Sequence, residues 1–100
     1  MVKHIVMWQI EGVNGLTKTE TALQIKQSLE ALNGQIEGLL NLEVGIDFLE
    51  SEASYDVVLV SELESQEALA HYQAHPLHIK AATEIVKPAA TSRVVVDYEV

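Results

Sequence analysis

Residues 42–63 read LEVGIDFLESEASYDVVLVSEL, and this stretch decides the fold. Apolar side chains alternate with polar or small ones over residues 42–49, and residues 56–63 are rich in valine and leucine. Both patterns are typical of strands. The polar segment between them, residues 50–54, is typical of a turn. The sequence therefore predicts two consecutive strands joined by a turn.

A helix is predicted on the N-terminal side of this pair of strands. Apolar residues recur at spacings of three and four over residues 17–33, which places them on one stripe. Thr17 or Thr19 is suited to cap the start of the helix, and Asn33-Gly34 supplies a C-terminal stop.

A second helical stretch is predicted over residues 66–75. Pro76 stops or bends it, and one or two further helical turns follow over residues 77–86. Strand-like segments, residues 3–10 and 93–99, stand at the two ends of the chain. The resulting order predicts an α+β, ferredoxin-like βαββαβ fold with an antiparallel sheet and helices on one face.

Alternation along the strands predicts which face of the sheet the helices cover. The face expected under the helices carries His4, Val6, Trp8, Ile10, Leu42, Val44, Ile46, Phe48, Val57, Leu59, Ser61, Leu63, Val94, Val96 and Tyr98. The opposite face combines Ile5, Met7, Val58, Val60 and Val95 with Lys3, Glu43, Asp47, Asp56, Glu62, Arg93 and Asp97. Its centre is too apolar for comfortable exposure to water, so we expect a symmetric homodimer through this face.

Composition and charge exclude several classes of function. The chain has 100 residues, which suits one domain over residues 1–100, and a formal net charge of −9. Acidic charge argues against binding to nucleic acid and to anionic membrane surfaces. The sequence has no apolar run long enough to span a bilayer and no secretory signal, so we expect a cytoplasmic protein. The absence of cysteine excludes disulfides, thiolate catalysis and cysteine-based zinc sites.

The chemically useful side chains concentrate in residues 70–78, AHYQAHPLH, which hold three of the four histidines. Helical spacing places Tyr72 on the buried side, and strand alternation places His4 on the helix side. A neutral imidazole can abstract a proton, and a phenol can donate to a developing oxyanion, so the two together suggest an acid–base site. The alternative is that these side chains are structural.

A metal site is the second interpretation of the same histidines. His71, His75 and His78 are spaced so that two imidazoles could reach one ion. Zinc requires three or four protein ligands, and no partner carboxylate accompanies these histidines. We therefore predict neither a metal site nor a cofactor.

Several segments of the chain resemble one known family. The segments are residues 1–8, residues 36–38 with 42–45, residues 55–60, residues 67–69 with Tyr72 and the His75-Pro76-Leu77-His78 motif, and residues 95–98. They are similar to the strands, the turn and the Tyr-x-x-His-Pro-x-His helix end of the stress-responsive A/B barrel (Dabb) domain. Glu37 stands where the family usually has proline.

The resemblance implies a dimeric α/β barrel, and it implies a site. One branch of the family is a polyketide cyclase that needs no cofactor, and its catalytic tyrosine and histidine correspond to Tyr72 and His78. Its pocket histidines correspond to His4 and to Val57, so one of them is absent here. Some family members are associated with stress and have no defined chemistry, which leaves a non-enzymatic interaction module as the alternative.

We therefore predict a pocket for a small hydrophobic ligand under the helices. His78 is expected to be the general base and Tyr72 the hydrogen-bond donor, with Pro76 turning the chain between them. Residues expected to contact the ligand are His4, Trp8, Val57, Leu59 and Leu69. His71 is expected to be exposed and dispensable, and large side chains such as Trp8 and Phe48 decide whether the pocket is open.

Overall fold

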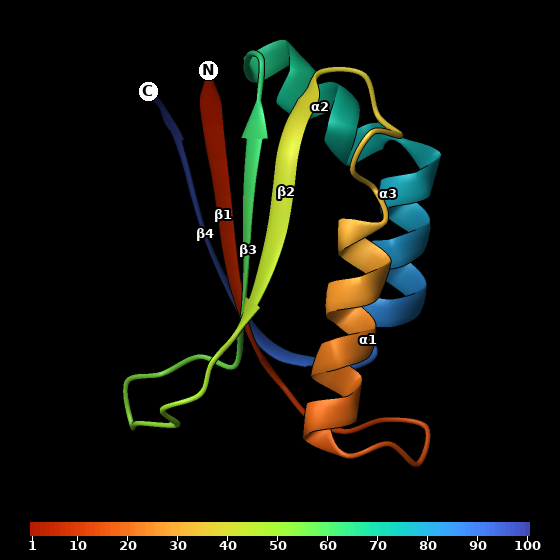
Figure 1. Ribbon diagram of the computed structural model, residues 1–100, viewed down its shortest axis with the longest axis vertical. Helices are drawn as coiled ribbons and strands as arrows, with labels where there is room; N and C mark the ends of the chain where they lie inside the picture. The colour runs from red at the N-terminus through yellow and green to blue at the C-terminus, as the bar shows by residue number, and fades with distance from the viewer.

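The helices and strands follow one another in the predicted order. A computed structural model describes residues 1–100. Its elements are β1 (Val2–Ile10), α1 (Lys18–Glu30), β2 (Leu39–Ile46), β3 (Val57–Leu63), α2 (Gln66–Ala74), α3 (Pro76–Ala81), the short π-helical turn η1 (Ala82–Val86) and β4 (Ala90–Glu99). The strands form one sheet in the order β2-β3-β1-β4, with every neighbouring pair antiparallel. The helices all lie on one face of this sheet (Figure 1), so the ferredoxin-like βαββαβ prediction is confirmed.

Capping side chains and a proline determine where the helices begin. Thr17 and Glu20 form a capping box, in which the Thr17 hydroxyl accepts from the Glu20 N–H at 3.1 Å and the Glu20 carboxylate accepts from the Thr17 N–H at 2.9 Å. Ser65 caps α2 by accepting from the Ala68 N–H at 3.1 Å. Pro76 is the first residue of α3, a position where its missing N–H costs no hydrogen bond.

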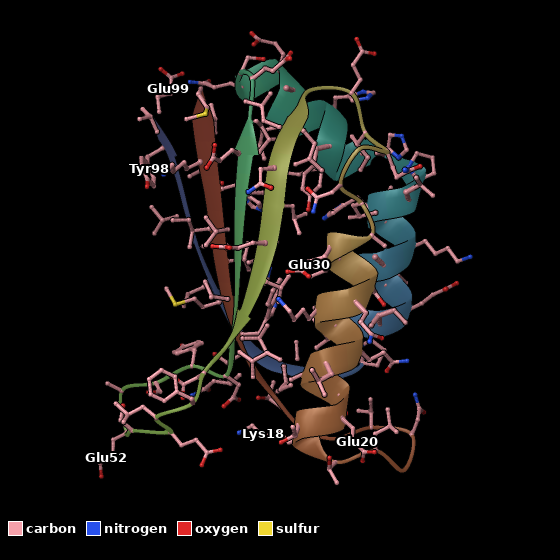
Figure 2. All side chains as sticks on the ribbon, in the orientation of Figure 1. Lys18, Glu20, Glu30, Glu52, Tyr98 and Glu99 are labelled. Atoms are coloured by element: carbon pink, nitrogen blue, oxygen red, sulfur yellow. The ribbon has the colours of Figure 1, made fainter.

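Close contacts with β2 position α1 and α2 on the sheet. Lys26 donates to the Val44 carbonyl at 2.7 Å, and Glu30 accepts from the Val44 N–H at 3.0 Å, so α1 is tied to β2. Figure 2 shows Glu30 between α1 and β2. Gly38 has a φ of +86°, and a Cβ at this position would lie 2.8 Å from the Ala68 Cβ, so glycine lets α2 pack closely over the start of β2.

The side chains of β4 alternate in the opposite phase to the prediction. Val95 is paired with Val6 and Asp97 with His4, and directly opposed residues share one face of a sheet. Arg93, Val95 and Asp97 therefore lie on the helix side, and Val94, Val96 and Tyr98 lie on the other side. Figure 2 shows Tyr98 on the side of the sheet away from the helices. The three successive valines 94–96 show no alternation of apolar and polar residues. Only the pairing of β4 with β1 therefore determines which face of the sheet each β4 side chain takes.

The predicted position of Phe48 is also wrong. β2 runs from Leu39 to Ile46, so it starts and ends three residues earlier than expected. Asp47 accepts a hydrogen bond from the Glu50 N–H at 2.7 Å, which starts the connection to β3, and Phe48 lies in this connection with 92% of its surface exposed. Phe48 therefore fills no pocket under the helices.

The outer face of the sheet, opposite the helices, remains uncovered (Figure 1). Its large apolar side chains include Met7, Val94, Val96 and Tyr98, which are between 37% and 58% exposed. None of the helices has both the length and the hydropathy needed to cross a membrane.

Candidate functional site

A cavity of about 350 Å³ lies between the helix side of the sheet and the α3–η1 segment. Its apolar lining comes mainly from the sheet, with further residues from η1 and α1, and includes Val6, Trp8, Leu29, Leu59 and Val86. Its polar lining consists of His4, His78, Thr83, Lys87 and Arg93. Apolar walls with a few convergent polar groups are typical of small-molecule sites.

His78 presents an unprotonated nitrogen at neutral pH. Its Nδ1 lies 3.2 Å from the Gln73 carbonyl oxygen, which can only accept, so Nδ1 carries the hydrogen and Nε2 carries the lone pair. Burial lowers the pKa of His78, and the nearby His4, Arg93 and His75 side chains lower it further against the opposing effect of the Gln73 carbonyl. The neutral imidazole is therefore available as a base at Nε2.

Tyr72 packs directly against this imidazole. The ring centroids of Tyr72 and His78 are 4.4 Å apart at an interplanar angle of 48°, and the His4 ring lies edge-on at 6.2 Å. The Tyr72 side chain is fully buried, and its hydroxyl has no hydrogen-bond partner. Burial also raises the pKa of Tyr72, so the phenol stays protonated and keeps an unused donor.

His4 is held by a carboxylate that the sequence analysis had placed on the other face. The His4 side chain is almost completely buried, and its Nδ1 contacts Asp97 Oδ1 on β4. Because a carboxylate accepts, this contact places a hydrogen on His4 Nδ1. The opposite phase of β4 brings Asp97 beside His4.

The predicted site residues are brought together in part. His4, Trp8, Leu59 and His78 line the cavity, whereas Tyr72 lies behind His78 and is not part of the lining. His71 is exposed.

Two other predicted ligand contacts, Val57 and Leu69, lie outside this cavity. Val57 is buried opposite Trp8 in the β1–β3 pairing, at the far end of the sheet from His4. Leu69 borders a separate hollow beside Gln66 and Tyr98 at the β1–β4 edge. Strand alternation and helical spacing place a residue on a face but do not place it along the strand or helix axis relative to a cavity.

Three polar lining residues, Arg93, Lys87 and Thr83, were not predicted from the sequence. Arg93 reaches the cavity because β4 has the opposite phase to the prediction, and Lys87 reaches it from the turn between η1 and β4. Thr83 lies on η1, and π-helical turns of this kind are frequent at functional sites. Apart from the helical spacing of its apolar residues, the sequence of residues 82–87 has no pattern that indicates a functional role.

The histidines do not gather into a metal site. No group of three or more His, Asp or Glu side chains is arranged to hold an ion. His71 and His75 form an edge-to-face pair with ring centroids 5.7 Å apart.

Comparison with known proteins identifies the family. Residues 2–100 match the Stress Responsive A/B Barrel Domain, abbreviated Dabb, and the chain belongs to this family. The resemblance inferred from the sequence is therefore confirmed.

The chain is similar to both uncharacterised and characterised proteins. An uncharacterised protein of Streptomyces coelicolor is 28% identical, with 99% of each chain covered. A dimeric protein of unknown function with a ferredoxin-like fold from Bacteroides fragilis is 29% identical, with a TM-score of 0.84 over 99% of this chain and 95% of that one. A hydroxynitrile lyase from Passiflora edulis shares the fold, with a TM-score of 0.80 and 21% identity over 99% and 92% of the two chains.

Proposed function

We propose that the cavity binds a small, mainly apolar molecule and that His78 acts on it as a general base, without a cofactor. The observation that carries this proposal is a neutral imidazole on the wall of an apolar cavity, with Nδ1 engaged by a backbone carbonyl and Nε2 free. A base whose pKa lies near or below neutrality is unprotonated at the pH where it must work.

The reaction class that suits this site is proton abstraction from a carbon next to a carbonyl group. Nε2 of His78 takes the proton, the C–H electron pair forms a carbon–carbon double bond, and the carbonyl oxygen becomes an enolate oxygen. The buried phenol of Tyr72 keeps its donor free behind the His78 ring, so it would donate to the developing enolate oxygen only if the His78 side chain moves aside and the ligand passes the cavity lining. Return of the proton restores the carbonyl, so no oxidant or reductant is needed.

The pair formed by His4 and Asp97 supports the same site. Asp97 holds the His4 ring in one orientation, and this ring lies edge-on to Tyr72. Groups held in place before the substrate arrives lose little freedom on binding, which lowers the barrier to the chemical step. We assign His4 to positioning.

The test is exchange of the acetophenone methyl hydrogens for deuterium in D₂O, followed by proton NMR. Acetophenone has an apolar ring and one carbonyl, so it is a minimal substrate for this chemistry. We expect the protein to accelerate exchange, His78→Ala to reduce the enzymatic rate by about a hundredfold or more, and Tyr72→Phe to reduce it less. His71→Ala is the matched control because His71 is exposed and outside the cavity.

Two outcomes would contradict the assignment. If His78→Ala and His71→Ala reduced the exchange rate equally, His78 would not be the base and the histidines would be structural. Binding of acetophenone without any acceleration of exchange would favour the alternative, a binding module without chemistry. Binding is read from the fluorescence of Trp8, which lines the cavity and is the single tryptophan of the chain.

We also infer that two copies of the chain pair through the outer face of the sheet. Apolar side chains of β1, β3 and β4 gather there with no helix over them. An apolar face of this kind is a common interaction surface, and a second identical sheet is a self-complementary cover for it. The dimeric state of the similar Bacteroides fragilis protein supports the inference.

A further inference from the structure

We propose that the ligand of the cavity carries a carboxylate group, which Arg93 and Lys87 bind. This inference rests on the proposed function, because it concerns the molecule that the cavity takes. It assigns the ligand to a chemical class, the small apolar acids, and it gives a role to two residues that the proton-transfer chemistry does not use.

The charges of the cavity differ from those of the protein as a whole. The chain carries 15 acidic and 6 basic residues. None of the acidic residues lines the cavity, whereas two of the basic ones, Lys87 and Arg93, do. A neutral ligand would require no such separation of charge, and an anionic ligand would be repelled by the rest of this acidic surface unless the cavity carried local positive charge.

Both cations of the cavity lack a partner within the chain. Lys18 pairs with Asp56 at 2.8 Å and Lys26 with Glu30 at 2.7 Å, but neither Arg93 nor Lys87 forms an ion pair. Asp97, on the same face of β4 as Arg93, is engaged by His4. Arg93 and Lys87 therefore keep their charge and their hydrogen-bond donors available to a ligand.

The backbone brings the two cations to the same cavity. Arg93 lies directly opposite Trp8 in the β1–β4 pairing, so both side chains share the helix side of the sheet. Lys87 ends η1, where its N–H donates to the Ala82 carbonyl at 2.8 Å, and the Ala89 N–H donates to the Val86 carbonyl at 3.0 Å. These bonds define the turn between η1 and β4, and the two cations lie on either side of it.

The apolar residues of the cavity lining indicate what the rest of the ligand is like. Val6, Leu29 and Leu59 supply apolar walls, and Trp8 supplies an aromatic one. The volume of about 350 Å³ lies at the small end of the range for ligand pockets. A bare inorganic anion would leave these walls unused, whereas an acid with a short apolar body would bury them and still reach the guanidinium of Arg93.

The experiment compares phenylbutyrate with phenylbutyramide, which has the same apolar body but a neutral amide in place of the carboxylate, with Trp8 fluorescence as the measure of binding. We expect the acid to bind at least about tenfold more tightly than the amide, and this preference to weaken as salt is added. Arg93→Gln and Lys87→Gln are each expected to reduce the preference severalfold, and the double variant to abolish it while amide binding stays unchanged.

Lys80→Gln is the matched control. It removes the same charge from α3, but Lys80 is exposed and does not line the cavity. We expect it to keep the preference for the acid. An equal loss in Lys80→Gln would mean that the net charge of the protein, and not these two residues, sets the preference, which would overturn the assignment.

The outcomes separate this inference from the proposed function. Equal binding of acid and amide would overturn the carboxylate assignment and leave the ligand cavity standing. Binding of neither compound would contradict the cavity as a ligand site and would remove both proposals. Inorganic phosphate is the third probe, and if it binds as tightly as phenylbutyrate, the recognised group is a phosphate without an apolar body, which also overturns the assignment.

Discussion

The rings of Tyr72 and His78 pack against each other at a tilt of 48° with their centroids 4.4 Å apart, although six positions separate them in the chain. In one continuous α-helix these residues would be separated by about 9 Å along the axis and would point in different directions. The helix is not continuous, because α2 ends before Pro76 and α3 begins at it. His75 is in an extended conformation between the two helices. The break in the helix thus creates the contact on which the candidate site depends.

Tyr72→Phe should separate stability from function. The Tyr72 hydroxyl is buried without a partner, and an unsatisfied buried polar group costs about 1–3 kcal/mol. We expect Tyr72→Phe to raise the free energy of unfolding in urea by about 1 kcal/mol while it slows deuterium exchange of acetophenone. Tyr55→Phe is the control, since the Tyr55 hydroxyl lies 3.3 Å from Ser92 Oγ and its loss should destabilise the protein slightly. A destabilised Tyr72→Phe would mean that the hydroxyl is bonded in solution.

The stability of the protein should depend on pH through His78. Burial lowers the pKa of His78 below its ordinary value of 6.5, so the unfolded chain takes up a proton at a higher pH than the folded protein does. The unfolded state therefore binds more protons as pH falls through 6.5, and stability is lost over the window between 6.5 and the lower pKa of the folded state. Above that window the contribution of His78 to stability is constant.

Urea unfolding of the wild type and of His78→Gln over this pH range measures the effect. The difference in unfolding free energy between the two proteins should shrink as pH falls. Proton NMR of the imidazole gives the pKa directly, and Arg93→Gln should raise it, because Arg93 is one of the charges that lower it. A His78 pKa at or above 6.5 would contradict the neutral base.

Asp97→Ala should destabilise the protein through the buried side chain of His4. The side chain of His4 is 3% exposed and that of Asp97 is 41% exposed, so removing the carboxylate leaves a buried imidazole donor without its partner. We expect a loss of about 1–3 kcal/mol in the free energy of unfolding and slower acetophenone exchange. Glu52→Ala, at an exposed position in the connection between β2 and β3, should change stability by less than about 0.5 kcal/mol. Equal effects of the two substitutions would show that the contact between His4 and Asp97 is unimportant.

Val96→Glu should prevent the proposed dimer. Val96 is 58% exposed on the outer face, and a charge there would be buried without a partner at the interface. Light scattering should find about 22 kDa for the wild type, twice the chain mass of 11.0 kDa, and about 11.0 kDa for the variant. Ile79→Glu is the control because Ile79 is exposed on α3, in the helical layer, and this variant should stay dimeric. A monomeric wild type at micromolar concentration would contradict the dimer.

The sequence by itself determined the features that depend on near neighbours in the chain. The start of α1, for which Thr17 or Thr19 was the predicted cap, and the break at Pro76 depend on interactions within a single turn, so they can be read from a few adjacent residues. The two-residue period of a strand placed His4 and Leu59 on the helix side, and burial alternates along β1 and β3 in the phase that this period predicts. These local signals were sufficient for the element order and the sheet face of the candidate site.

Tertiary structure alone decided the features that depend on pairing between distant segments. Val94, Val95 and Val96 carry no alternation, so the pairing of β4 with β1 determined that Asp97 faces His4 and that Arg93 reaches the cavity. The cavity itself exists because α1, η1 and the sheet leave a space between side chains that no local pattern describes. Local sequence specifies backbone conformation, whereas register and packing are set by contacts between residues far apart in the chain, and the candidate site lies where those contacts converge.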